Sequence, residues 1–248
     1  MLDFIIAVLS LILYVGLMVL GFLYLKKRGH KMSFRHVLSG TMCYMMIMYL
    51  FGNGIITGIK ELVPFFSGTI ASSILYGVIS SVMLFLIYLM MEKLFLRERI
   101  NEDTKVALSF GCALGEAVFS LLSPMLTYVV IELHIGNGTI NDWILTNMGD
   151  MPEESVEAIA TYYQNIGSSY VIFMALAVSA LLIYHQIAGE HYVNGLGNKK
   201  IELLWGLLFT FIFNTLYQVI PMFGFIFGII YILLYDIVGY RYLIKIRA

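Results

Sequence analysis

Residues 4–25, with the sequence FIIAVLSLILYVGLMVLGFLYL, contain no charged side chain, and Lys26, Lys27 and Arg28 follow them directly. An apolar helix of about 20 residues is long enough to cross a hydrocarbon layer of roughly 30 Å. The stretch therefore predicts a membrane-spanning helix that ends in a basic cluster. Because acidic Asp3 and no basic residue precedes it, we expect this helix to stay in the mature protein rather than to be cleaved as a signal peptide.

Similar apolar stretches recur along the whole chain. We place seven predicted spans at residues 4–25, 37–58, 69–91, 106–131, 169–187, 201–219 and 222–240. The composition agrees, because 60% of the residues are hydrophobic and only 12% are charged, whereas soluble domains carry about 25% charged residues. The sequence predicts an all-α fold, a polytopic transmembrane helix bundle that forms a single domain over residues 1–248.

The basic residues lie in alternate loops. Of the fifteen Lys and Arg residues, fourteen fall in 26–36, 92–105, 188–200 or the tail after residue 240, and Lys60 is the exception. Loops on the cytoplasmic side keep Lys and Arg, so we predict an outside N-terminus and an inside C-terminus in a bacterial cytoplasmic membrane. The lipid bilayer is the expected environment, and a formal net charge of -1 gives no indication of nucleic-acid binding.

The longest segment between predicted spans, residues 132–168, is acidic and lies on the predicted outer side. Asp150 as N-cap and Pro152 in the first turn predict a short amphipathic helix there. Trp143, with Ile144 and Leu145, predicts an anchor at the membrane interface. Two interpretations stay open: a cap over a cavity that opens outward, or a helix that only packs on the bundle.

Small residues predict where helices meet. Glycine pairs four residues apart occur in the second, fourth and seventh predicted spans, and such pairs let helix backbones approach closely, so we expect these three spans at the centre. The pairs are Gly54 with Gly58, Gly111 with Gly115, and Gly224 with Gly228. Cys43 and Cys112 also lie inside predicted spans, where we interpret them as small buried side chains rather than a disulfide.

Glu116 is the most costly residue to bury in this sequence. It lies ten residues into the fourth predicted span, which at 1.5 Å per residue is about 15 Å deep, near the bilayer centre. An intramembrane carboxyl group faces the bundle interior or finds a partner, and it is a candidate functional site. Asn214 and Gln218, one turn apart on the sixth predicted span, are candidate hydrogen-bonding partners of Glu116, and Asn53 is another.

A second group of polar residues, His185, Glu190 and His191, follows near the end of the fifth predicted span. Two zinc ligands on one helix are three or four residues apart, but these histidines are six apart, so the group predicts a polar cluster at the cytoplasmic face rather than a metal site. Gly189 is expected to fray the helix there. No pattern in the sequence indicates a cofactor or a bound metal.

The order of the spans, the segment Arg35-His36-Val37-Leu38-Ser39-Gly40 and the segment Phe110-Gly111-Cys112-Ala113-Leu114-Gly115-Glu116-Ala117 together resemble the YhfC family of intramembrane proteases. That family is related to the CPBP (Abi) glutamic-type proteases. The resemblance implies a helical bundle in which glutamate and histidine activate a water molecule for peptide hydrolysis within the membrane.

The catalytic positions of that family match only in part. Glu116 and Ala117 correspond to the fourth-helix motif, but Cys112 stands where the family has histidine. The paired glutamates of the third helix fall at Met83 and Leu84, and the later histidines at Val178 and Asn214. Because hydrolysis needs a general base and a group that stabilises the oxyanion, we expect Glu116 without a nearby histidine to be inactive.

Three functions are therefore carried forward. The first is a non-catalytic, partner-binding, regulatory or accessory membrane subunit with a protease-like bundle, whose candidate binding residues are Glu116, Asn214, Gln218, Cys112 and Asn53. Its expected partner is another membrane protein or a membrane-embedded peptide. The second is an active peptidase that uses Glu116 as its catalytic residue. The third is a transporter or permease subunit in which the same polar groups line a solute path.

Overall fold

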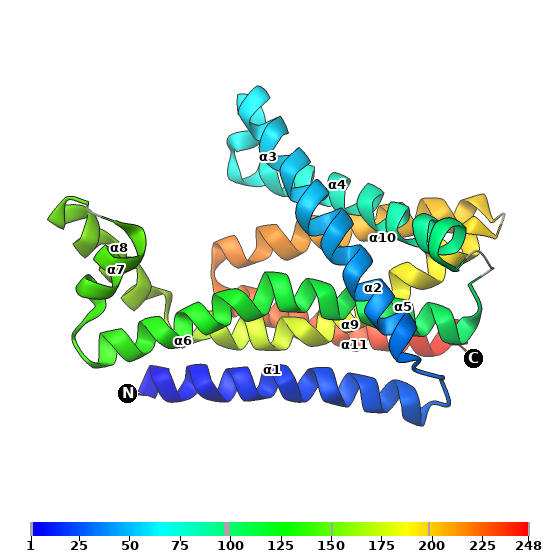
Figure 1. Ribbon diagram of the computed structural model, residues 1–248, viewed down its shortest axis with the longest axis horizontal. Helices are drawn as coiled ribbons and strands as arrows, with labels where there is room; N and C mark the ends of the chain where they lie inside the picture. Colours follow the sequence, from blue (N-terminus) through cyan, green and yellow to red (C-terminus); the bar gives the residue numbers. More distant parts are fainter. Residues whose placement is uncertain (1, 97–99, 150, 198, 248) are drawn as a thin grey trace.

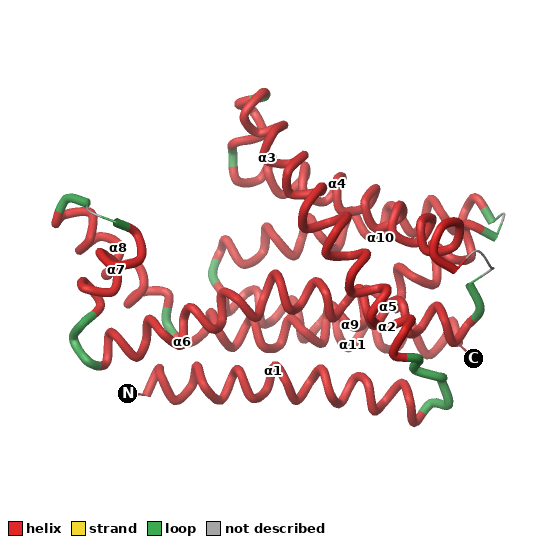
Figure 2. Tube along the Cα trace, viewed as in Figure 1, coloured by secondary structure: helices red, strands yellow, loops and turns green. Residues whose placement is uncertain are grey.

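The computed structural model describes residues 2–96, 100–149, 151–197 and 199–247. This part of the chain contains helices and loops and no strand (Figure 2). Seven helical segments within it are long and apolar enough to cross a membrane. They span Leu2–Lys27, Phe34–Leu62, Thr69–Lys93, Glu102–Gly136, Ser168–Leu196, Lys200–Phe223 and Phe225–Ile246. The prediction of a seven-span helical bundle is confirmed, and the structure extends most of the predicted spans at both ends.

The basic loops gather at one end of the molecule. The end of α1 (Leu2–Lys27), the start of α5 (Glu102–Ala117) and the end of α11 (Phe225–Arg247) lie together there (Figure 1). We call this the basic end; Arg97 and Arg99 of the predicted clusters lie outside the described residues. The opposite end, which carries the N-terminus, is called the outer end. The basic loops on which the topology prediction rests thus lie at one end, and the assignment of that end to the cytoplasmic side stays a prediction.

Helix α9 (Ser168–Leu196) occupies the centre of the bundle. It packs against α1, α5, α10 (Lys200–Val219) and α11. In both the α5 and α9 spans, 67% of the most apolar stretch is buried, compared with 33% in the second span and 17% in the seventh. The prediction that the second, fourth and seventh spans form the centre was therefore wrong for the second and the seventh, and the fifth span takes the central position.

Helix α2 (Phe34–Tyr44) crosses α5 at a contact that depends on glycine. A Cβ atom added to Gly111 would lie 2.1 Å from the backbone oxygen of Val37, and one added to Gly40 would lie 2.4 Å from that of Leu108. The predicted close approach at Gly111 is confirmed. Gly54 and Gly58, in α3 (Asn53–Leu62), have no atom within 4 Å of such a Cβ, so the same spacing produces no contact there.

Gly224 does not form part of a helix face with Gly228. It lies before the first residue of α11 with φ of +128°, in a turn that follows η5 (Ile220–Phe223). A side chain at this backbone conformation is strained, which explains the glycine. Gly228 does pack closely, because an added Cβ would lie 2.8 Å from the ring of Phe173 in α9. The seventh span packs closely on the central helix at a second glycine as well, since a Cβ added to Gly239 would lie 2.7 Å from the side chain of Ile183 in α9.

Three helical runs contain π-helical turns. The second span passes from α2 through η1 (Met45–Gly52) to α3, and the third passes from α4 (Thr69–Met90) into η3 (Met91–Leu96). The fourth passes from α5 through η4 (Val118–Leu122) into α6 (Ser123–Gly136). Such turns are rare in proteins and occur often at functional sites.

A small helical cap stands on the outer end of α6. It consists of α7 (Ile140–Met148) and α8 (Glu153–Ile166), the predicted amphipathic helix (Figure 1). The predicted N-cap, Asp150, lies outside the described residues. Ile144, predicted as part of an interfacial anchor, is instead fully buried in the cap. It packs in a cluster with Ile131, Ile140, Val156 and Ala160.

Candidate functional site

Glu116 lies in the last turn of α5, in the interior of the bundle, where its exposed fraction is 4%. The helix that carries it begins at a well-formed N-terminus, since the side chain of Asn101 accepts a hydrogen bond from the backbone N–H of Thr104. Glu102 and Asp103 follow in the first turn, next to the positive end of the helix dipole. The interior position predicted for Glu116 agrees with the structure.

A histidine faces this carboxyl group. Nε2 of His185, in α9, lies 2.7 Å from Oε2 of Glu116, and the exposed fraction of His185 is 0%. The expectation that Glu116 has no nearby histidine was therefore wrong. Its cause is the end of α9, which was predicted at residue 187 but continues to Leu196, so that His185 lies well inside the helix.

Gly189 does not fray α9 as expected. An added Cβ at this position would lie 2.1 Å from Oγ of Ser109 and 2.5 Å from the hydroxyl oxygen of Tyr88. The Tyr88 hydroxyl and Ser109 Oγ are themselves 2.7 Å apart and hydrogen-bonded. The glycine thus permits close packing between α9 and a hydrogen bond that joins α4 to α5.

Phenol groups surround the Glu116–His185 pair. The hydroxyl groups of four tyrosines lie close enough to the Glu116 carboxyl group to interact with it electrostatically, and they come from four different helices: Tyr44, Tyr76, Tyr184 and Tyr217. The ring of Tyr44 packs edge-on against that of His185, with centroids 5.6 Å apart. Hydrogen bonds in such a water-poor environment are electrostatically stronger than in water.

π-helical turns begin directly beside this cluster. Segment η4 starts two residues after Glu116, and η1 starts at the residue after Tyr44. Each turn changes the register of its helix, so the residues on its two sides face directions that a regular α-helix would not give them. The helix that carries Glu116 and the helix that carries Tyr44 thus both become irregular beside the pair, whereas α9, which carries His185, stays a regular α-helix.

The other candidate binding residues take different positions. Asn214 is buried, but its side chain donates to the hydroxyl of Tyr184 at 2.9 Å and to the backbone oxygen of Thr210 at 3.0 Å. It reaches the pair only through Tyr184. Gln218 is half-buried and Asn53 is exposed. Within the described residues neither hydrogen-bonds to Glu116.

Cys112 lies one turn before Glu116 and is 1% exposed. Its Sγ is 3.7 Å from the backbone oxygen of Gly40, and it lies close enough to Glu116 and Cys43 to interact with both electrostatically. Both cysteines are free thiols. Cys112 thus fills the α2–α5 contact, while an imidazole reaches the carboxyl group of Glu116 from α9.

The residues His185, Glu190 and His191 do not form one cluster. His185 contacts Glu116, whereas Glu190 pairs with Lys105 of α5, and Nδ1 of His191 lies 2.7 Å from Glu202 of α10. In the part of the chain that the structure describes, no group of three His, Cys, Asp or Glu residues is arranged to hold a metal ion. Three polar side chains of α9 therefore contact three separate partners.

Lys105 is a buried cation that the sequence did not reveal. The sequence predicts a loop over residues 92–105, but α5 begins at Glu102, so Lys105 lies in the first turn with its side chain 5% exposed. Its Nζ pairs with the carboxylates of Glu102 and Glu190. Glu190 also accepts a hydrogen bond from Asn194 at 3.0 Å. This cluster ties the beginning of α5 to the end of α9.

A separate pocket of about 370 Å³ lies near the outer end of the bundle, beneath α8. Residues of α6, α8 and the beginning of α9 line it, among them four tyrosines, Tyr128, Tyr162, Tyr163 and Tyr170. The predicted cap thus stands over a pocket, and Glu116 and His185 do not line it.

Comparisons with known proteins identified no relative of this chain. No family model, no curated protein and no solved structure matches the chain. The fold and the contacts define a polytopic membrane protein with a helical bundle.

Proposed function

We propose that this chain is a non-catalytic, partner-binding or accessory membrane protein whose bundle resembles that of the intramembrane proteases. One observation carries the proposal: the acid–imidazole pair and the outward pocket lie in different places. Glu116 and His185 are 4% and 0% exposed, and the pocket beneath α8 is lined by other residues. A peptide held in that pocket would meet tyrosine rings rather than a carboxyl group.

The contacts of Glu116 support a structural role. A general base must reach a water molecule, and the reaction needs a donor for the oxyanion within hydrogen-bonding distance. Here Oε2 of Glu116 is hydrogen-bonded to His185 of the other central helix, α9. Buried polar groups that satisfy one another between two spans hold those spans together where lipid gives no hydrophobic drive.

The outer pocket supports the binding of a partner. Tyrosine is enriched in protein interfaces, because its ring supplies apolar contact area and its hydroxyl a hydrogen bond. Tyr162 is 62% exposed and stands at the rim, while Tyr128 is buried at the base. The end of a membrane-embedded helix, or an extended peptide from another membrane protein, is the occupant that this chemistry favours.

The second candidate is an active glutamic-type intramembrane peptidase, and the Glu116–His185 hydrogen bond favours it. Nδ1 of His185 is buried without a hydrogen-bond partner among the described residues. A water molecule admitted there would contact the imidazole that positions Glu116. In that function Glu116 is the base, and His185 orients it.

A cleavage assay separates the two candidates. Purified protein in liposomes is incubated with a series of membrane-spanning peptides, and the wild type is compared with Glu116→Gln, which keeps the size of the side chain. The proposal expects equal, background cleavage by both proteins. Cleavage by the wild type that Glu116→Gln abolishes would contradict the proposal and support the peptidase.

Crosslinking tests the partner site directly. A photoreactive amino acid is placed at Thr127, which lines the outer pocket, or at its neighbour Leu126, which is 46% exposed and does not line it. In membranes of cells that make the protein, we expect one protein species to crosslink to position 127 and not to 126. Equal crosslinking from both positions would mean that the pocket holds no partner.

A further inference from the structure

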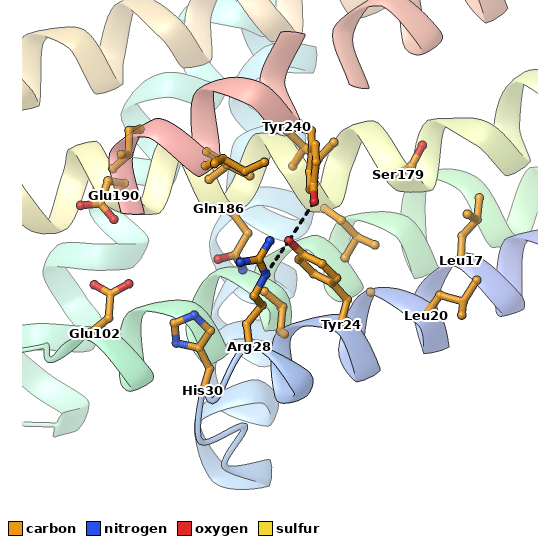
Figure 3. Close-up of a pocket in the computed structure, with 17 residues that line it drawn as sticks. Leu17, Leu20, Tyr24, Arg28, His30, Glu102, Ser179, Gln186, Glu190 and Tyr240 are labelled. Atoms are coloured by element: carbon orange, nitrogen blue, oxygen red, sulfur yellow. Dashed lines mark hydrogen bonds between the residues drawn. The ribbon is translucent and has the colours of Figure 1, made fainter. Parts of the chain in front are cut away.

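A second, larger pocket opens at the basic end, far along the bundle from the outer pocket. Its volume is about 840 Å³, within the range of about 300–1,000 Å³ that small-molecule sites occupy. Residues of α1, α9 and α11 line it (Figure 3). Its lining is apolar along Leu17, Leu20 and Leu182 and polar around Arg28, Glu102 and Glu190, and we call this polar part the mouth.

An arginine stands on one side of the mouth. Nε of Arg28 donates to the hydroxyl of Tyr24 at 3.0 Å, and that hydroxyl is 3.1 Å from the hydroxyl of Tyr240 in α11 (Figure 3). The guanidinium group also lies 5.3 Å from the centroid of the Tyr24 ring. Among the described residues no carboxylate lies within ion-pair distance of Arg28. Guanidinium groups bind phosphate oxygens through parallel N–H donors.

Two carboxylates stand on the other side. Glu102 and Glu190 both line the pocket, and Lys105 lies between them. Two carboxylates against one ammonium leave this side with an excess of one negative charge. The Glu102 side chain is 53% exposed and lies on the same side of the pocket as Glu190 (Figure 3). His30, between the two sides, is 3.5 Å from Asp103.

The mouth therefore presents a cation and an anionic group above an apolar slot. We propose that this pocket binds a zwitterionic phospholipid with a primary ammonium group, a phosphatidylethanolamine from the leaflet at the basic end. The phosphate contacts Arg28 and the two phenol hydroxyls, and the ammonium group contacts Glu102 and Glu190. The upper part of an acyl chain lies along Leu17, Leu20 and Leu182, and the remainder extends into the bilayer through the open side.

Charge and hydrogen bonding decide among the common headgroups. An anionic lipid without an ammonium group would bring its phosphate to Arg28 but would place no cation near the two carboxylates. A phosphocholine carries a cation, yet its three methyl groups leave it without N–H donors for Glu102. Only the primary ammonium offers a positive charge and hydrogen bonds to the carboxylate side.

Lipid titration of the purified full chain in detergent tests the proposal. Dioleoyl phosphatidylethanolamine, phosphatidylcholine and phosphatidylglycerol are compared by native mass spectrometry of bound lipid. We expect the ethanolamine lipid to bind about tenfold more tightly than the other two, because a single lost charged contact commonly changes affinity by about that factor. Equal binding of all three, or tightest binding of the glycerol lipid, would overturn the proposal.

Single substitutions test which residues bind the phosphate and which bind the ammonium group. Arg28→Gln is expected to weaken binding of the ethanolamine lipid about tenfold, whereas Lys27→Gln, an exposed basic neighbour outside the pocket, leaves it unchanged. Glu102→Gln is expected to remove the preference for ethanolamine over glycerol. Lys27, Arg28 and Glu102 are all exposed, so the three variants should fold. Unchanged binding in Arg28→Gln, or an unchanged preference in Glu102→Gln, would overturn the proposal.

Competition with a water-soluble compound distinguishes a lipid site from a site for a free headgroup. Glycerophosphoethanolamine, which has the headgroup without acyl chains, is added in competition with the lipid. We expect no displacement at a hundredfold excess, because the apolar slot supplies part of the binding. Displacement at equal concentrations would show a soluble ligand and would overturn the lipid assignment.

Discussion

Two polar clusters join the same pair of helices, and they differ in how much water reaches them. In the interior of the bundle Glu116 of α5 meets His185 of α9, with side chains 5% and 0% exposed. At the basic end Lys105 of α5 meets Glu190 of α9, but here Glu102 adds a third charged group that is 53% exposed. The central cluster is closed, because both of its side chains are buried, whereas the end cluster has one open member, the solvent-exposed Glu102. The difference indicates that α5 and α9 are fixed together at the centre and that the basic end keeps polar groups available to a ligand.

The largest expected effect on stability is that of removing the histidine partner of Glu116. His185→Leu removes the imidazole and leaves the carboxyl group of Glu116 buried without its histidine partner, and we expect this to cost about 3 kcal/mol, the upper end of the penalty for an unsatisfied buried polar group. Unfolding of the purified protein in detergent by a denaturant measures the loss. A cost under about 1 kcal/mol would mean that the carboxyl group is satisfied without His185 and that the closed cluster is not held by this pair.

The corresponding change at the basic end should cost less. Glu190→Gln leaves Lys105 with Glu102 as a remaining carboxylate, so we expect a loss of about 2 kcal/mol, within the range for a hydrogen bond to a charged group. The same unfolding measurement applies. A loss larger than that of His185→Leu would reverse the ranking of the two clusters.

The packing between the two clusters gives a third comparison. Gly189→Ala places a Cβ against Ser109 and Tyr88, and we expect a loss of about 1–2 kcal/mol because overpacked interiors must shift their neighbours. Gly16→Ala in α1 is the matched control, since no atom lies within 4 Å of its added Cβ. Equal effects of the two substitutions would show that α9 and α5 are not in close contact at Gly189.

The smallest effect belongs to the open member of the end cluster. Glu102→Gln should change the free energy of unfolding by less than about 1 kcal/mol, because exposed ion pairs contribute little. The small change should also diminish further at high salt, which screens exposed charges. A loss above about 2 kcal/mol would show that the end cluster is as closed as the central one.

The spans and the interior position of Glu116 could be predicted from the sequence, because length and hydropathy alone decide whether a helix crosses a membrane. The end of α9 could not. The polar residues from His185 to Asn194 lower the local hydropathy, yet they stay helical because α5 and α10 supply partners for them. Hydropathy along one segment contains no information about partners on another.

The same limit applies to the glycines. Gly111 with Gly115 and Gly54 with Gly58 have identical spacing, but only the first pair meets a neighbouring helix. Spacing identifies a face that permits close approach, and the arrangement of the other helices decides whether a neighbour occupies it. The pocket at the basic end is a further case, because it combines Arg28 and Tyr240, which are far apart in the sequence.

A double-mutant cycle on Glu116 and His185 tests most directly whether the pair holds the two central helices together. The free energies of unfolding of the wild type, Glu116→Leu, His185→Leu and the double variant are measured in the same detergent. We expect the double variant to be more stable than the sum of the single losses predicts, with a coupling of about 1–3 kcal/mol. Losses that add within about 0.5 kcal/mol would contradict a structural pairing of the two residues.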